Sequence, residues 1–162
     1  MAARVALAGS PMTPPDPTWF LPDWAPNLHP IVVHFPIGLL VTAFVVDVFA
    51  FVFRRQKFFN QGAAGLYTLG TLLACVAFLT GRNAAATVFT PGMAHALVDE
   101  HWTWGLWTTL YFCALTSLRL VVQRRLATEP RTLWGLMVLG GALGVLLLAG
   151  TAERGAGLVY QY

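Results

Sequence analysis

The chain has very few charged residues. Only 10% of its 162 residues are Asp, Glu, Lys or Arg, whereas an average soluble domain has about a quarter. Hydrophobic residues make up 57% of the sequence, and the mean hydropathy is +0.64. A soluble domain of this length could not bury so much apolar surface. The composition therefore excludes an ordinary soluble protein and indicates that lipid covers much of the molecule.

Signatures of several other protein classes are also absent. The sequence contains neither a glycine-rich nucleotide loop nor a nucleophile–base constellation, so we do not expect an enzyme that acts alone. The net charge of +3 comes from basic residues in short loops, which is not the footprint of a nucleic-acid partner. Residues 1–9 are too short for the apolar region of a signal peptide and precede a Pro-rich stretch.

Four long apolar runs dominate the rest of the sequence. Each approaches the roughly 18–23 residues that a helix needs to cross about 30 Å of hydrocarbon. We predict an all-α integral membrane protein that folds as a four-transmembrane-helix bundle. The predicted spans are residues 31–53, 63–80, 102–122 and 133–150, within a membrane domain of residues 29–162 that follows an extended Pro/Trp-rich tail of residues 1–28.

Basic residues predict the orientation of this bundle. Most of them follow the first span or lie between the third and the fourth: Arg54, Arg55, Lys57, Arg119, Arg124, Arg125 and Arg131. The opposite side has only Arg4, Arg82 and Arg154. The positive-inside rule then places both termini and the tail in the periplasm, with the bundle in a bacterial inner membrane.

All four histidines fall in the outer half of the predicted bundle. His34 begins the first span and His101 begins the third, so both can lie at one depth on different helices. Two facing imidazoles are what a six-coordinate b-type haem requires. We therefore prefer His34 and His101 as axial haem or metal ligands, with Gly105 leaving room for the macrocycle. His29 and His95 are weaker candidates that can equally bond to headgroups or carbonyls.

Three charged groups could support this site or the fold. Arg82 and Arg154 lie on the same side as the histidines and could contact haem propionates or a protein partner. Asp47 is the one acid within a span, and an intramembrane acid can transfer protons or bind a quinone. Arg119 lies at a similar depth, so we favour a buried structural pair of Asp47 with Arg119.

The two cysteines, Cys75 and Cys113, both fall inside predicted helices. Counted from the outer ends of their spans, their depths differ by roughly 9 Å. We therefore expect no disulfide between them, and two small buried apolar side chains instead.

The start of the first span carries a recognisable motif. Residues 29–36 read HPIVVHFP and resemble the HPxxVHFP-type opening of the domain-of-unknown-function 2231 family of predicted membrane proteins. Asp47 and His101 are similar to an acid and a histidine that occur in the family, and residues 152–160 resemble its closing GGxLVY motif. Members commonly have an acid inside that closing motif and a histidine just after its Tyr, whereas here Gly157 precedes Leu158 and Gln161 follows Tyr160.

The resemblance implies a respiratory setting, because family members tend to accompany c-type cytochromes and Rieske proteins. Our leading hypothesis is a membrane subunit of an electron-transfer complex that binds haem b near the periplasmic face. Its partners would be other membrane subunits and a c-type cytochrome or a quinone. Two alternatives stay open: a cofactor-free accessory subunit, and a small quinone- or metal-binding membrane protein.

Overall fold

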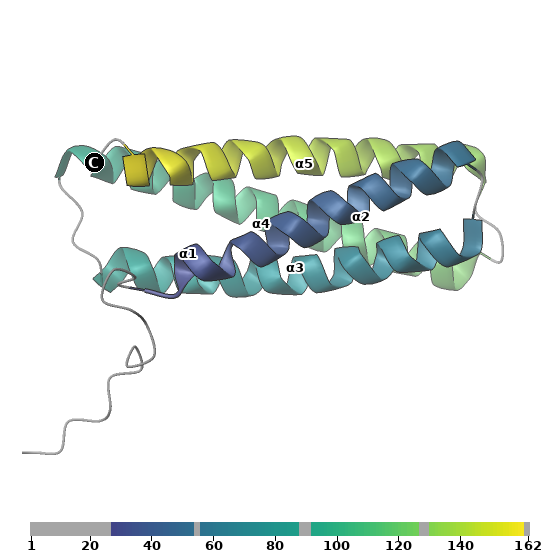
Figure 1. The fold of residues 1–162 in the computed structure, drawn as a ribbon, viewed down its shortest axis with the longest axis horizontal. Coiled ribbons are helices and arrows are strands. Elements are labelled where there is room, and N and C mark those ends of the chain that lie inside the picture. The colour runs from purple at the N-terminus through teal and green to yellow at the C-terminus, as the bar shows by residue number, and fades with distance from the viewer. Residues whose placement is uncertain (1–26, 54–55, 88–91, 127–129, 161–162) are drawn as a thin grey trace, which may run out of the picture.

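The structure is a computed structural model that describes residues 27–53, 56–87, 92–126 and 130–160. Every element in these ranges is helical, and four long helices run side by side (Figure 1). The elements are α1 (His29–Val32), α2 (His34–Phe53), α3 (Gln56–Thr87), the short 3₁₀ helix η1 (Gly92–Ala94), α4 (His95–Arg125) and α5 (Arg131–Tyr160). The predicted tail falls outside the described residues as far as residue 26.

Four helical segments are long and apolar enough to cross a membrane. They cover His29–Phe53, Phe58–Ala86, Gly92–Arg125 and Arg131–Tyr160. The prediction of an all-α bundle with four spans is therefore confirmed, and each predicted span lies inside one of these segments. The segments are longer than predicted because helix continues into the more polar sequence outside the hydrocarbon. At about 1.5 Å per residue, such helices project beyond a bilayer core of about 30 Å.

The first span contains a short interruption at its outer end. Pro30 lies in the first turn of α1, where its missing N–H costs no helical hydrogen bond. Pro36 cannot donate to the carbonyl of Val32, and its ring crowds that carbonyl. The regular helix therefore breaks at Val33, although the backbone of this residue stays near helical values at φ −62° and ψ −26°. The chain thus continues from α1 into α2 with only a local distortion.

Small residues hold the four helices close together. Helix α2 packs on α3 and α5, and α4 packs on α3 and α5, which closes the bundle. A Cβ at Gly144 of α5 would lie 2.7 Å from Phe112 of α4, and one at Gly70 of α3 would lie 2.8 Å from Leu40 of α2. Backbones therefore approach at glycines, as membrane helix interfaces commonly require. The buried core of the bundle consists of Leu40, Ala43, Tyr67, Phe112 and Leu148.

The outward faces of the long helices carry large apolar side chains. Leu139 and Leu146 of α5, for example, are 67% and 68% exposed. In water such a large exposed apolar surface would favour aggregation. Against lipid tails it is the expected outer face of a transmembrane bundle.

The two cysteines lie much closer than their predicted depths implied. The Sγ atoms of Cys75 on α3 and Cys113 on α4 are 3.8 Å apart, and both residues are free thiols. The expected depth difference is wrong because α3 does not end near Thr80 but continues to Thr87. The outer end of this helix lies farther along the chain than predicted, so the predicted depth of Cys75 was too shallow.

Candidate functional site

Polar side chains gather at two separate levels of the bundle. One group surrounds Asp47, near the end of α2, and we call the ends of the helices around it the ion-pair end. The other group surrounds His29, at the start of α1, and we call that end the histidine end. The C-terminal turns of α5 lie at the histidine end (Figure 1).

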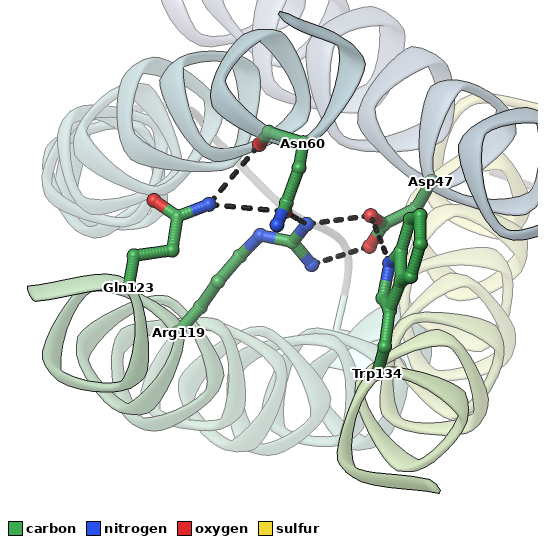
Figure 2. A network of polar contacts seen from close by, with 5 residues as sticks. All are labelled: Asp47, Asn60, Arg119, Gln123 and Trp134. Atoms are coloured by element: carbon green, nitrogen blue, oxygen red, sulfur yellow. Dashed lines mark hydrogen bonds and ion pairs between the residues drawn. The ribbon is translucent and has the colours of Figure 1, made fainter. Parts of the chain in front are cut away.

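Asp47 and Arg119 form a bidentate ion pair across the bundle, as their similar depth predicted (Figure 2). Arg119 donates from Nη1 to Oδ2 and from Nη2 to Oδ1 of Asp47, each at 2.5 Å. The side chains are only 4% and 0% exposed. A paired geometry of this kind is the strong form of a charge-assisted hydrogen bond.

Three further polar side chains complete this ion-pair network. Asn60 of α3 accepts from Arg119 Nη2 at 2.5 Å and from Gln123 Nε2 at 3.0 Å. Trp134 of α5 lies with its indole N–H 3.5 Å from Asp47 Oδ1. The network therefore joins α2, α3, α4 and α5 (Figure 2).

Sequence reasoning did not find Asn60, Gln123 or Trp134. A signal existed for Gln123, which follows Arg119 by four residues and so lies on the same helical face. Asn60 lies outside the predicted span and carries no such signal.

Two buried polar atoms beside this network have no partner among the described residues. They are the hydroxyl of Tyr67 and Nε of Arg119. The Arg119 guanidinium carbon lies 5.4 Å from the centre of the Tyr67 ring, which adds a cation–π contact. The Asp47 charge is matched directly by Arg119, and the network connects four helices.

At the other end, the structure brings His101 together with His29 and not with the preferred His34. The ring centres of His29 and His101 are 6.3 Å apart, and the ring planes meet at 71°. No hydrogen bond or ring contact among the described residues joins His34 to His101. His34 is exposed, with Nδ1 2.6 Å from the Pro30 carbonyl, and His95 is also exposed.

The reason lies in helical geometry. His29 and His34 are five residues apart, which turns their side chains about 140° away from each other at 3.6 residues per turn. Depth alone made His34 the better candidate, whereas the structure places His29 beside His101. We call His29 and His101 the histidine pair.

Both imidazoles of the histidine pair are held through Nδ1. His101 Nδ1 lies 3.0 Å from the carbonyl of Thr151 on α5, which can only accept a hydrogen bond. His29 Nδ1 lies 3.2 Å from Thr80 Oγ1 on α3. That hydroxyl already donates to the carbonyl of Ala77 at 2.9 Å, so it accepts from His29.

These partners determine the tautomer of each ring. The Thr151 carbonyl requires the proton of His101 on Nδ1, and donation from the Thr80 hydroxyl to Ala77 favours the same tautomer for His29; this tautomer leaves a lone pair on Nε2. The contacts of these rings with Thr80 and Thr151 do not use Nε2. A histidine that donates from one nitrogen to a carbonyl or hydroxyl and keeps a lone pair on the other is in the state that ligates metals.

Each imidazole also packs against a glycine of a neighbouring helix. A Cβ at Gly81 of α3 would lie 2.8 Å from His29 Cε1, and a Cβ at Gly155 of α5 would lie 2.9 Å from His101 Cε1. Any larger residue would push the ring away. The space expected beside Gly105 is partly occupied, because Phe78 and Thr151 lie 3.9 Å from the position of its Cβ.

The two predicted arginines lie at the histidine end. Arg154 stacks on Trp104, with its guanidinium carbon 4.1 Å from the ring centre, and donates to the Gly150 carbonyl at 2.9 Å. Its Nε forms an ion pair with Glu100 Oε2 at 3.5 Å but no hydrogen bond. Arg82 is exposed and directly follows Gly81, the glycine beside His29.

Fold and site together define a class: an integral membrane four-helix protein with an ion-pair network at one end and a histidine pair at the other. Within that class, the chain belongs to the DUF2231 family, described as predicted membrane proteins, whose profile matches residues 25–162. No curated protein and no solved structure matches the chain.

Proposed function

We propose that this protein is a membrane subunit of a bacterial electron-transfer complex that binds haem b through His29 and His101. The observation that carries the proposal is the histidine pair, in which both rings are anchored through Nδ1 with Nε2 left available. This replaces His34 by His29 as the partner of His101.

The spacing of the two rings fits ligation of one iron. Bonds from a metal to an imidazole nitrogen are about 2 Å long, so two rings on opposite sides of one metal have centres roughly 6 Å apart. The observed separation is 6.3 Å.

The number of available ligands favours haem over a bare ion. A structural zinc site uses four protein ligands and a catalytic one uses three, and within the described ranges no group of three His, Cys, Asp or Glu is placed to hold a metal. Haem iron needs only two axial ligands from the protein.

Other residues would support the same cofactor. Thr80 and the Thr151 carbonyl hold the imidazoles in the ligating tautomer. Arg154 and Arg82 supply positive charge at the histidine end, where it would pair with propionates or an acidic face of a c-type cytochrome. A haem held here would supply one-electron transfer to such a cytochrome or to a quinone.

The orientation follows from the basic residues. Arg124, Arg125 and Arg131 lie at the ion-pair end, which the positive-inside rule assigns to the cytoplasm of a bacterial inner membrane. The histidine end then faces the periplasm. This is the side on which a soluble c-type cytochrome could reach it.

A reduced-minus-oxidised absorption spectrum of the full chain, purified in detergent after expression with a haem supply, tests the proposal. We expect a haem b band in the unaltered protein, and its loss in His29→Ala and His101→Ala. His34→Ala and His95→Ala are matched controls that remove exposed imidazoles, and they should keep the band.

Two outcomes would contradict the proposal. A protein without any haem band would favour the cofactor-free accessory subunit. A band that depends on His34 but not on His29 would return the axial pair to His34 and His101.

A further inference from the structure

Two thiols on neighbouring helices face each other in the middle of the bundle. Cys75 belongs to α3 and Cys113 to α4, and their Sγ atoms are 3.8 Å apart. One turn closer to the ion-pair end, the hydroxyls of Thr71 and Thr116 are hydrogen-bonded at 2.8 Å across the same two helices. The pair is therefore held at a level where α3 and α4 already touch.

The separation is short enough for the thiols to react with each other. A disulfide bond is about 2.05 Å long, so the two sulfurs need to approach by less than roughly 2 Å. A rotation about one side-chain bond, or a small shift of one helix, can supply this movement. Both cysteines are half-buried, so neither is sealed inside the core.

The surroundings determine what could oxidise the pair. Cys75 lies within the apolar segment Phe58–Ala86 and Cys113 within Gly92–Arg125. Neighbouring side chains such as Val76 (44% exposed) and Leu110 (48% exposed) face outward, where lipid would cover them. Water-soluble oxidants do not partition into this layer, whereas a quinone does.

We propose that Cys75 and Cys113 form a reversible dithiol that a membrane quinone oxidises to a disulfide joining α3 to α4. Two S–H bonds break and one S–S bond forms. The two electrons and two protons reduce the quinone to its quinol. This inference rests on the thiol geometry and on the apolar surroundings of the pair, and it is independent of haem at the histidine pair.

The experiment uses the full chain in detergent micelles, reduced and then desalted without oxygen. Decyl-ubiquinone is added as the probe, free thiols are counted by maleimide labelling after denaturation, and quinol is followed by its absorbance. We expect the unaltered protein to lose both thiols together, to lose the mass of two hydrogen atoms, and to yield one quinol per chain. Dithiothreitol should restore both thiols.

Single-cysteine variants provide the matched controls. Cys75→Ser and Cys113→Ser should each keep their remaining thiol and reduce no quinone, while their melting temperatures show that they are folded. His29→Ala should form the disulfide as readily as the unaltered chain, which separates this inference from the haem proposal. Retention of both thiols in the unaltered protein, or their loss only through cross-linked dimers, would overturn it.

Discussion

The two ends of the bundle treat buried polar groups in opposite ways. At the ion-pair end, Asp47 and Arg119 are almost fully buried and use each other as partners, with Asn60 taking a further Arg119 N–H. At the histidine end, His29 and His101 are half-buried, and each uses its Nδ1 for a contact with a neighbouring helix.

This difference supports the proposal that one end holds the helices together and the other binds a cofactor. Two buried charges that neutralise each other stabilise one arrangement of helices and attract a ligand little, even though Arg119 Nε and the Tyr67 hydroxyl have no partner among the described residues. An imidazole that is oriented through Nδ1 can still bind a ligand through Nε2. The comparison predicts that changes at the ion-pair end alter stability, whereas changes at the histidine end alter cofactor binding.

The largest effect should come from breaking the ion pair. Asp47→Leu leaves the Arg119 charge buried without its partner, which should lower the free energy of unfolding by about 3–5 kcal/mol. The double variant Asp47→Leu/Arg119→Met removes both charges and should be more stable than Asp47→Leu alone. Thermal unfolding in detergent measures both, and a double variant as unstable as the single one would contradict a simple ion pair.

A smaller effect is expected at the partner of His29. Thr80→Val removes the hydroxyl that accepts from Nδ1 and should weaken haem affinity by about 10–100-fold, as loss of such supporting bonds does at metal sites. Thr68→Val is the control, since that hydroxyl bonds only within α3, to the carbonyl of Ala64. Haem titration checks both, and equal losses in the two variants would argue against a specific role of Thr80.

Gly155, the glycine beside His101, offers a third test. Gly155→Ala places a methyl group 2.9 Å from Cε1 of that ring, and the forced displacement should reduce haem affinity about tenfold. Gly105→Ala on α4 is the control, because its nearest neighbours are 3.9 Å away. If the alanine at position 105 were the more harmful of the two, a macrocycle beside Gly105 would be favoured instead.

The smallest effect on stability is expected from a second change at the ion-pair end. Trp134→Phe removes an indole N–H that lies 3.5 Å from Asp47 Oδ1 but keeps an aromatic ring against Phe51. We expect a loss of about 1 kcal/mol in stability and an unchanged haem spectrum. Paired unfolding and absorption measurements check this, and a lost spectrum would link the two ends.

The sequence predicted the fold and the ion pair better than the histidine pair. The spans follow from apolar runs whose length must match the bilayer. Asp47 has few possible basic partners at its depth, so depth alone was enough to select Arg119. The outer end of α3 could not be predicted in this way, because its last turns carry no long apolar run.

The pairing of the histidines depends on direction as well as depth. Depth is readable from the sequence, but the side on which His29 lies depends on the local break at Val33 and on the close approach permitted by Gly81. The cysteines show the same limit, since their contact depends on where α3 ends. Both features follow from helix packing, which a single sequence does not specify.

The most direct test of the contrast between the two ends compares the reduced-minus-oxidised spectra of two variants purified side by side. We predict that Asp47→Leu/Arg119→Met, which lacks the ion pair, keeps the haem b band per mole of folded chain, whereas His29→Ala loses it. A band that disappears from both variants, or that survives in both, would contradict the division into a structural end and a cofactor-binding end.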